Sequence, residues 1–207
     1  LTLHDVMWRR VPDAVPAAMR AATDVMVPRG ARRADRVITG AAAAKADIVA
    51  ELGVDPERID VVPHGLGSPV VPGDAERGRA LLGTEPWRPI VLCVATDVPH
   101  KNLGALVEIV AAIDADRRPL LVLAGHGTDG GRLDALAAER VAGADVRTLG
   151  AVTQSDLEDL YAAATVLATP TRFEGFGLPV LEAMARGVPV LCSDLPVLRE
   201  IAGDDAR

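Results

Sequence analysis

Short runs of aliphatic and β-branched residues alternate along the chain with longer stretches in which apolar residues recur every three or four positions. The short runs predict strands, and the longer stretches predict helices. Apolar residues are continuous within the runs, which indicates strands buried on both faces, as in a parallel sheet covered by helices. We therefore predict an α/β fold with a doubly wound parallel sheet. The predicted strands are residues 59–62, 90–94, 120–124, 146–149, 165–169 and 189–192.

The intervening helices carry start and stop signals. Thr153, followed three residues later by Asp156, is typical of a capping box, and Gly53 indicates the end of an earlier helix. Pro179 suits the first turn of a helix, where its missing N–H costs nothing. The clearest apolar stripe at helical spacing consists of Leu103, Leu106, Val107 and Val110.

A stretch rich in glycine and proline, residues 65–74, separates two groups of elements and is typical of a linker between domains. Residues 1–65 are expected to be the C-terminal part of one domain, and residues 66–207 a second domain. The first part is predicted to hold a strand end at LTLHD, helices near 16–35 and 41–52, and the strand at 59–62.

Charge is distributed unevenly along the chain of 207 residues, whose net charge is −7. Residues 1–45 carry +4, so the remainder carries −11. The larger part therefore lacks the basic surface that nucleic acid requires, and no nucleic-acid partner is expected. In the basic part, four arginines at helical spacing predict one solvated helix face; the alternative is contact with an anionic membrane or acceptor. These are Arg29, Arg32, Arg33 and Arg36.

The two cysteines, Cys93 and Cys192, each lie inside an apolar run, where a reduced thiol behaves as a small hydrophobe. A disulfide framework is therefore not expected. No apolar run approaches the roughly 18 residues of a membrane helix. These features favour the cytoplasm, with peripheral contact at the inner face of the membrane as an addition that the basic N-terminal part would provide.

Two short motifs have alternative interpretations. Gly125, Gly127 and Gly130 form G-x-G-x-x-G between a strand and a helix, which leaves a nicotinamide enzyme open. Against it, this is not the first strand–helix unit of its domain, and no acid follows the next strand to hold a ribose. The D-x-D string at 114–116 resembles a motif that binds a divalent metal ion, but it follows a predicted helix and is interpreted as a helix end and turn. The histidines lack metal-ligand spacing, so we predict no metal.

The segment TRFEGFGLPVLEAMARGVPV, residues 171–190, carries the strongest chemistry. Gly175 and Gly177 allow a tight turn, and free amides near Phe176, Gly177 and Leu178 would face an anion at the helix start. A diphosphate suits that place. Carboxylates beside it are expected to accept hydrogen bonds from sugar hydroxyls. The two acids concerned are Glu174 in the loop and Glu182, which we place in the first turn of the helix. The alternative is that Glu174 is a solvated loop residue and Glu182 only adds negative charge at the helix start.

These residues closely resemble the E-x7-E signature of retaining glycosyltransferases of the GT-B fold, family four. The resemblance continues through LTLHD, ADRVITGAAAAKADI, VDPERIDVVPHGL, VPHKNL, LVLAGHG and VRTLGAV in the order of that family. It implies a Rossmann-like donor-binding domain at 66–207, truncated at its C-terminus, after the tail of an acceptor-side domain. The first part of that domain would precede Leu1 and further helices would follow Arg207, so the chain alone is expected to be inactive.

The resemblance also implies roles for matching residues. Lys101 would bind the donor diphosphate, with Asn102 capping the following helix and residues 149–152 bordering the base. The backbone amides of residues 176–178 would meet the phosphates, and Gly175 would belong to the same donor-binding loop. His4 in LTLHD would reach across the cleft toward the donor sugar. Glu174 would bind the transferred sugar, and Glu182 the ribose.

The resemblance implies a retaining transfer of mannose or glucose type from a GDP or UDP sugar to a glycan or lipid-linked acceptor, without a cofactor. The departing phosphate would act as the base, because the family pattern lacks a clear nucleophile. One departure is Thr96, where many members carry an arginine that binds the diphosphate. A non-catalytic relative that binds nucleotide sugars therefore remains the alternative.

Overall fold

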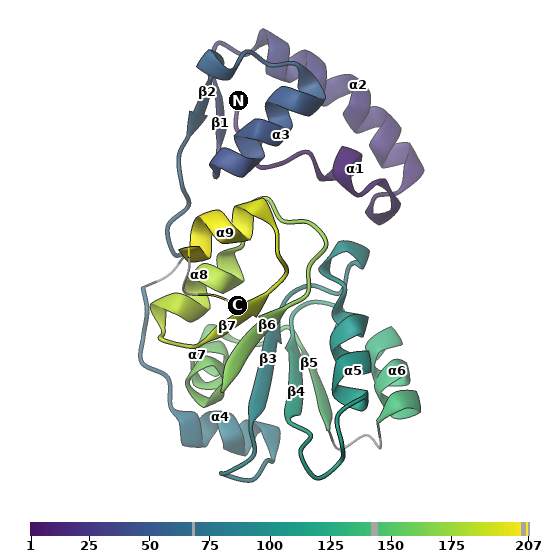
Figure 1. The fold of residues 1–207 in the computed structure, drawn as a ribbon, viewed down its shortest axis with the longest axis vertical. Helices are drawn as coiled ribbons and strands as arrows, with labels where there is room; N and C mark the ends of the chain where they lie inside the picture. The colour runs from purple at the N-terminus through teal and green to yellow at the C-terminus, as the bar shows by residue number, and fades with distance from the viewer. Residues whose placement is uncertain (68, 142–144, 204–205, 207) are drawn as a thin grey trace.

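The computed structural model describes residues 1–67, 69–141, 145–203 and 206. It is an α/β protein with a two-stranded and a five-stranded sheet, both parallel, as predicted (Figure 1). The two-stranded sheet pairs β1 (Val37–Thr39) with β2 (Ile59–Val61). The five-stranded sheet has the order β5-β4-β3-β6-β7 and consists of β3 (Ile90–Val94), β4 (Leu120–Ala124), β5 (Val146–Gly150), β6 (Val166–Thr169) and β7 (Val190–Cys192).

The five-stranded sheet is covered by helices on both faces. One face packs against α4 (Ala75–Leu82), α7 (Gln154–Ala163), α8 (Leu178–Ala185) and α9 (Pro196–Ala202). The other packs against α5 (Leu103–Ala111) and α6 (Arg132–Arg140). Alternate residues of β4 enter the two cores, so the whole strand is buried. The predicted stripe on α5 is buried in the second core, and Thr153 accepts a hydrogen bond from the Asp156 backbone N–H, so both helix predictions are confirmed.

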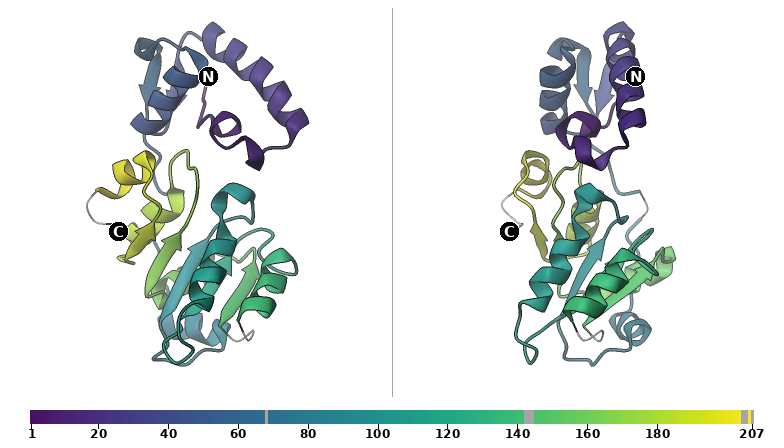
Figure 2. Two further views of the ribbon diagram at one scale, coloured as in Figure 1. Left: turned by 45° about the vertical axis from the view of Figure 1, so that its right-hand side comes forward. Right: turned by 90° about the vertical axis from the view of Figure 1, so that its right-hand side faces the viewer.

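A third, smaller core belongs to the N-terminal part. Its helices are α1 (Met7–Arg10), η1 (Pro12–Ala14), α2 (Ala17–Arg33) and α3 (Ala42–Leu52), and η2 (Pro56–Arg58) leads into β2. Gly53 ends α3 in a left-handed conformation, φ 64°, as its position predicted. The predicted strand end at LTLHD is a single bridge between Thr2 and Ile38. Residues 62–67 and 69–74 form no helix or strand and connect the two parts, which lie one above the other in both views of Figure 2.

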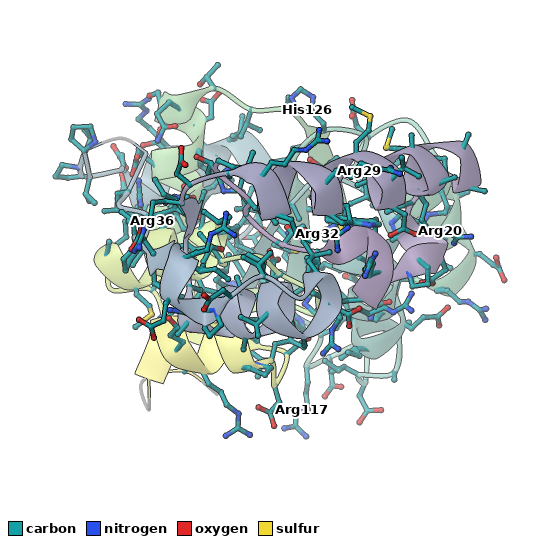
Figure 3. The ribbon with its side chains drawn as sticks, turned by 90° about the horizontal axis from the view of Figure 1, so that it is seen from above. Arg20, Arg29, Arg32, Arg36, Arg117 and His126 are labelled. Carbon is teal, nitrogen blue, oxygen red and sulfur yellow. The ribbon has the colours of Figure 1, made fainter. Side chains whose placement is uncertain are left out.

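The arginine face was only partly predicted. α2 begins at Ala17 and continues through Pro28, close to the predicted helix near 16–35. It ends at Arg33, which leaves Arg36 beyond the helix. Figure 3 shows Arg29 and Arg32 along α2 and Arg36 apart from them. Arg36 instead binds the carboxylate of Asp60 in β2 through two guanidinium nitrogens.

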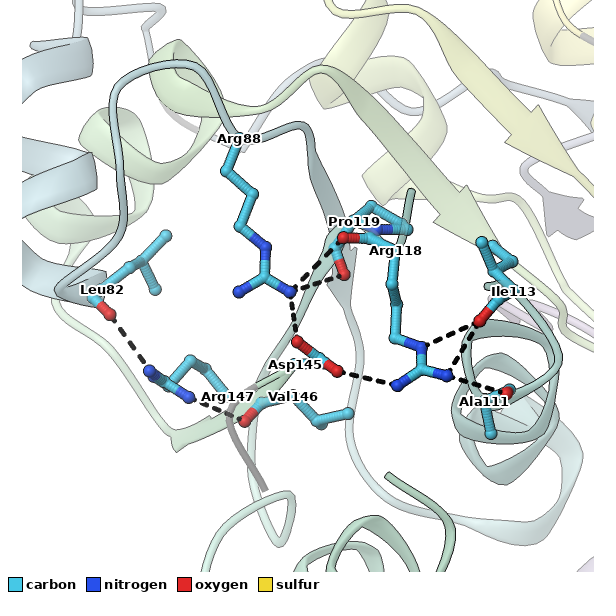
Figure 4. Close-up of polar contacts among 9 residues, drawn as sticks. All are labelled: Leu82, Arg88, Ala111, Ile113, Arg118, Pro119, Asp145, Val146 and Arg147. Atoms are coloured by element: carbon cyan, nitrogen blue, oxygen red, sulfur yellow. Dashed lines mark hydrogen bonds and ion pairs between the residues drawn. The ribbon is translucent and has the colours of Figure 1, made fainter. Parts of the chain in front are cut away.

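The amino ends of three neighbouring strands are joined by one carboxylate (Figure 4). Asp145, just before β5, accepts hydrogen bonds from Arg88, before β3, and from Arg118, before β4. Burial opposes ionisation of Asp145, but the two arginines outweigh that effect and lower its pKa. Arg118 also donates to the carbonyls of Ile113 and Ala111 at the end of α5.

Both cysteines are free, and burial of Cys93 in β3 raises the pKa of its thiol to about 12. No helix of the described residues is long and apolar enough to cross a membrane.

Candidate functional site

Two loops meet at the carboxyl end of the five-stranded sheet because the strands that precede them are neighbours. The first contains η3 (Pro99–Lys101) after β3, and the second runs from Pro170 to Gly177 after β6. Backbone and side-chain hydrogen bonds join them. The carbonyl oxygen of His100 accepts from the Arg172 N–H at 2.7 Å and the Thr171 hydroxyl at 3.1 Å, and the Asn102 amide donates to the Pro170 carbonyl at 3.3 Å.

This junction brings Lys101 and Glu174 together. The Lys101 Nζ lies 2.5 Å from the Glu174 Oε1, and the two side chains are only 20% and 10% exposed. A charge-assisted contact this short in a partly desolvated place orients both groups. The two residues are 73 positions apart in the chain, so their contact depends on the sheet order.

The mouth of α8 lies beside this pair. Gly177 precedes the helix with φ 105°, a value that favours glycine, and no side chain caps the helix start. Pro179 is the second helical residue, as its missing N–H predicts. The open amides and the helix dipole together make this end of α8 favourable for an anion.

A cavity of about 530 Å³ lies between this helix start and the N-terminal part of the chain. It brings together His4, Lys101, Glu174 and the loop 175–178, which the sequence had selected as candidates. His4 approaches from the opposite side, from the N-terminal part. The residues lining the cavity are His4, Asp5, His64, Gly65, Gly67, Lys101, Glu174, Gly175, Phe176, Gly177, Leu178 and Pro179.

Three candidate residues lie outside that lining. Thr96 is exposed after β3. Asn102 occupies the residue before α5, but its side chain binds Pro170 and caps no helix, which corrects the predicted capping role. Its φ of 56° places the backbone in the left-handed region.

Glu182 was expected in the first turn of its helix, and that placement was wrong. The loop glycines extend to residue 177, so Glu182 is the fifth residue of α8 and lies in the second turn. Its carboxylate accepts a hydrogen bond of 3.1 Å from the Tyr161 hydroxyl. Burial and the neighbouring carboxylate raise the pKa of Tyr161, so this phenol stays protonated as the donor.

A buried ion pair between Arg186 and Glu158 lies beside Tyr161. Arg186 binds the Glu158 carboxylate through two nitrogens at 2.6 Å, and both side chains are less than a tenth exposed. The Arg186 guanidinium also lies 4.9 Å from the centre of the Tyr161 ring. This network fixes the ring whose hydroxyl holds Glu182.

The two ambiguous motifs have structural explanations. A Cβ added at Gly125, directly after β4, would lie 2.1 Å from the carbonyl oxygen of Ala95, directly after β3, so the close approach of the two backbones explains this glycine. The residues of D-x-D form a turn in which the backbone carbonyl oxygen of Asp114 accepts a hydrogen bond from the Arg117 N–H. No group of three or more His, Cys, Asp or Glu side chains in the described part of the chain is placed to hold a metal ion.

Three residues at or beside the cavity were missed from the sequence. His64 and Asp5 line it, and Thr171 is buried beneath the Glu174 loop. His64 lies two residues after the predicted strand 59–62, in VVPHGL, and that position near a strand end was an available signal. Thr171 carried no signal, because its role is a contact with His100 from another strand's loop.

Residues 76–207 match the family model described as "Glycosyl transferases group 1". A curated relative, the MMP alpha-(1->4)-mannosyltransferase of Mycolicibacterium hassiacum, is 31% identical over 182 residues, which are 88% of this chain and 42% of the relative. The chain therefore spans less than half the length of that relative.

Solved structures share the fold. The glycosyltransferase WaaG, involved in lipopolysaccharide biosynthesis, aligns with a TM-score of 0.77 and 23% identity over 97% of this chain and 58% of its own. Anabaena HepE in complex with UDP-glucose aligns with a TM-score of 0.76 and 22% identity, over 96% of this chain and 54% of its own.

Proposed function

Because the chain belongs to the family of group 1 glycosyl transferases, with the GT-B fold, we propose that it moves a hexosyl group from a nucleoside-diphosphate sugar to an acceptor hydroxyl. The observation that carries this proposal is the Lys101–Glu174 pair at the open start of α8. We propose membership of glycosyltransferase family four, and a sugar of mannose or glucose type. A mannosyltransferase relative and a UDP-glucose-bound structural neighbour support that range.

In this proposal residues 66–207 form the donor-binding domain and residues 1–65 belong to the acceptor-side domain. The diphosphate binds at the amides of residues 175–178, and Lys101 turns from Glu174 toward it. The lysine then balances the charge of the leaving group, so no metal is required for that purpose. Asn102 and Thr96 stand in the same loop, where they support the donor side of the site.

The carboxylate of Glu174 is left beside the transferred sugar, where it binds hydroxyls and favours positive charge at the anomeric carbon. Transfer occurs with retention, with the departing phosphate as the base, so catalysis is mostly positioning and electrostatics. His4 contacts the donor sugar from the opposite wall. Glu182, oriented by Tyr161, binds the ribose hydroxyls.

The acceptor is a glycan or a lipid-linked sugar, and the reaction takes place in the cytoplasm, with peripheral membrane contact through the arginines of α2. The exposed Arg29, Arg32 and Arg33 support such a contact.

A thermal-shift panel tests the donor. GDP, UDP and ADP and their mannose and glucose conjugates are added to the whole protein, because a ligand bound only by the folded state raises the melting temperature. One nucleotide series is expected to stabilise the protein, with its sugar conjugate at least as effective. The absence of any shift in all series would contradict the proposed function.

A further inference from the structure

His64 occupies a place in the cavity that is prepared for it. It follows β2, is half-buried, and lines the same cavity as His4, Lys101 and Glu174. Its ring meets the edge of Phe176 at 83° with 4.9 Å between the centroids. The centroid of the His4 ring lies 5.3 Å from that of the His64 ring.

Gly40 leaves the space that the His64 ring fills. A Cβ added at Gly40 would lie 2.7 Å from the His64 Nε2 and 2.8 Å from its Cδ2, closer than real contacts allow. The Nε2–Cδ2 edge of the ring therefore faces the backbone after β1. Nδ1 is the ring atom opposite that edge.

The polar groups of the cavity differ in how they are paired. Lys101 and Glu174 bind each other, whereas the ring nitrogens of His64 make no hydrogen bond to any described residue. A neutral imidazole carries one donor and one acceptor nitrogen, and the partner usually fixes which is which. The His64 ring is thus packed against its neighbours, while its nitrogens remain available for hydrogen bonds beside the expected diphosphate.

From this geometry we propose that His64 is a further donor-binding residue, whose Nδ1 hydrogen-bonds the distal phosphate or the sugar attached to it. The inference rests on the proposed function, because the ligand is its nucleoside-diphosphate sugar. The phosphate and the sugar both offer oxygens that can hydrogen-bond an imidazole nitrogen. In the proposed function this end of the donor lies between the start of α8 and His4. The ring is fixed by Phe176 and Gly40 before binding, so little entropy is lost when the contact forms.

The test compares His64→Phe and His64→Asn with the wild type. Phenylalanine keeps a ring against Phe176 without nitrogens, and asparagine offers an amide near the place of Nδ1. Dissociation constants are measured by calorimetry for UMP, UDP and UDP-glucose and for GMP, GDP and GDP-mannose. The melting temperature without ligand checks that each variant folds.

We expect His64→Phe to weaken binding of the sugar nucleotide about three- to tenfold, as for one lost hydrogen bond, with the monophosphate unaffected. His64→Asn should recover most of that loss. Unchanged binding in His64→Phe, or an equal loss for the monophosphate, would overturn the inference, as would an equally large loss in His64→Asn. A wild-type protein that binds neither series would instead overturn the proposed function itself.

Discussion

The carboxylate of Glu200 in α9 caps the first turn of α3 across the two parts of the chain, accepting a hydrogen bond of 2.7 Å from the Ala42 N–H. Its second oxygen accepts from the next amide, Ala43, at 2.9 Å. No side chain of the N-terminal part caps this helix. The cap that α3 lacks locally is therefore supplied from 158 residues away, and it holds the N-terminal part against α9.

Glu200→Ala should lower the stability of the protein by about 1 kcal/mol, the usual loss when a helix cap is removed. For a chain of this size that corresponds to a fall in melting temperature of about 2–4 °C. Glu200→Gln retains one acceptor oxygen and should recover part of the lost stability. Glu139→Ala, which removes an exposed acid of α6, is the matched control and should leave the melting temperature unchanged. Equal effects at both positions would argue against the cap.

Replacement of Glu174 should separate binding from turnover. Glu174→Ala releases Lys101 from its 2.5 Å partner, so nucleoside diphosphate should bind at least as tightly as in the wild type. Turnover should fall by about 10²–10³-fold, as for other lost transition-state contacts. Calorimetry and a sugar-transfer assay on the whole protein measure the two effects. Unimpaired transfer in this variant would rule out a catalytic role for Glu174.

If no donor supports turnover in the wild type while nucleotide still binds, the alternative of a non-catalytic binder gains support. Lys101→Ala provides the complement, because it should weaken diphosphate binding while leaving monophosphate binding nearly unchanged.

Glu182 should confer a preference for ribose. If its carboxylate binds both ribose hydroxyls, Glu182→Ala should weaken the binding of ribonucleotides more than the binding of their 2′-deoxy and 3′-deoxy analogues, which lose only one contact, so that the preference for ribose disappears. Tyr161→Phe should reduce the same preference by a smaller factor, because it removes only the hydroxyl that orients the carboxylate. Dissociation constants for both analogue sets decide this. A preference that survives in Glu182→Ala would place the ribose elsewhere.

Asp145 should make stability depend on pH in the acid range. Its folded pKa lies below the ordinary value of 3.8, so its contribution is fully present above about pH 5 and is lost as the pH falls through the folded pKa. Asp145→Asn should cost about 2 kcal/mol at neutral pH, since two charge-assisted hydrogen bonds are weakened. Urea unfolding at pH 7 and pH 3 measures this. The difference between variant and wild type should shrink at pH 3, and a constant difference would contradict the assignment.

The strands of the large sheet could be predicted because burial on both faces leaves continuous apolar runs, as in β4. The strand β1 was missed because only three residues form it and Ile38 at its centre is 40% exposed, so no continuous run marks it. Arg36 was predicted to lie on a helix because its spacing from the other arginines fits one. The spacing could not show that its guanidinium binds Asp60, which lies on a strand.

The site could be predicted in composition but not in contacts. Glu174 and the glycines before α8 are close together in the chain, so their role could be predicted from the sequence. The pairing with Lys101 and the place of His64 depend on which strands are neighbours and on how the two parts of the chain meet. Asn102 shows the same limit, because this typical capping residue donates to the Pro170 carbonyl of the neighbouring loop and does not cap α5.

The charge cluster around Asp145 lies at the amino ends of β3, β4 and β5, whereas the cavity opens at the carboxyl ends of their sheet. Residues that anchor the strands and residues that line the cavity are therefore different sets at opposite ends of the sheet. Directed evolution can exploit this separation. Under the proposed function, libraries confined to the loops around residues 64, 96–102 and 174–178 would vary donor specificity while the anchoring arginines and their shared aspartate remain unchanged.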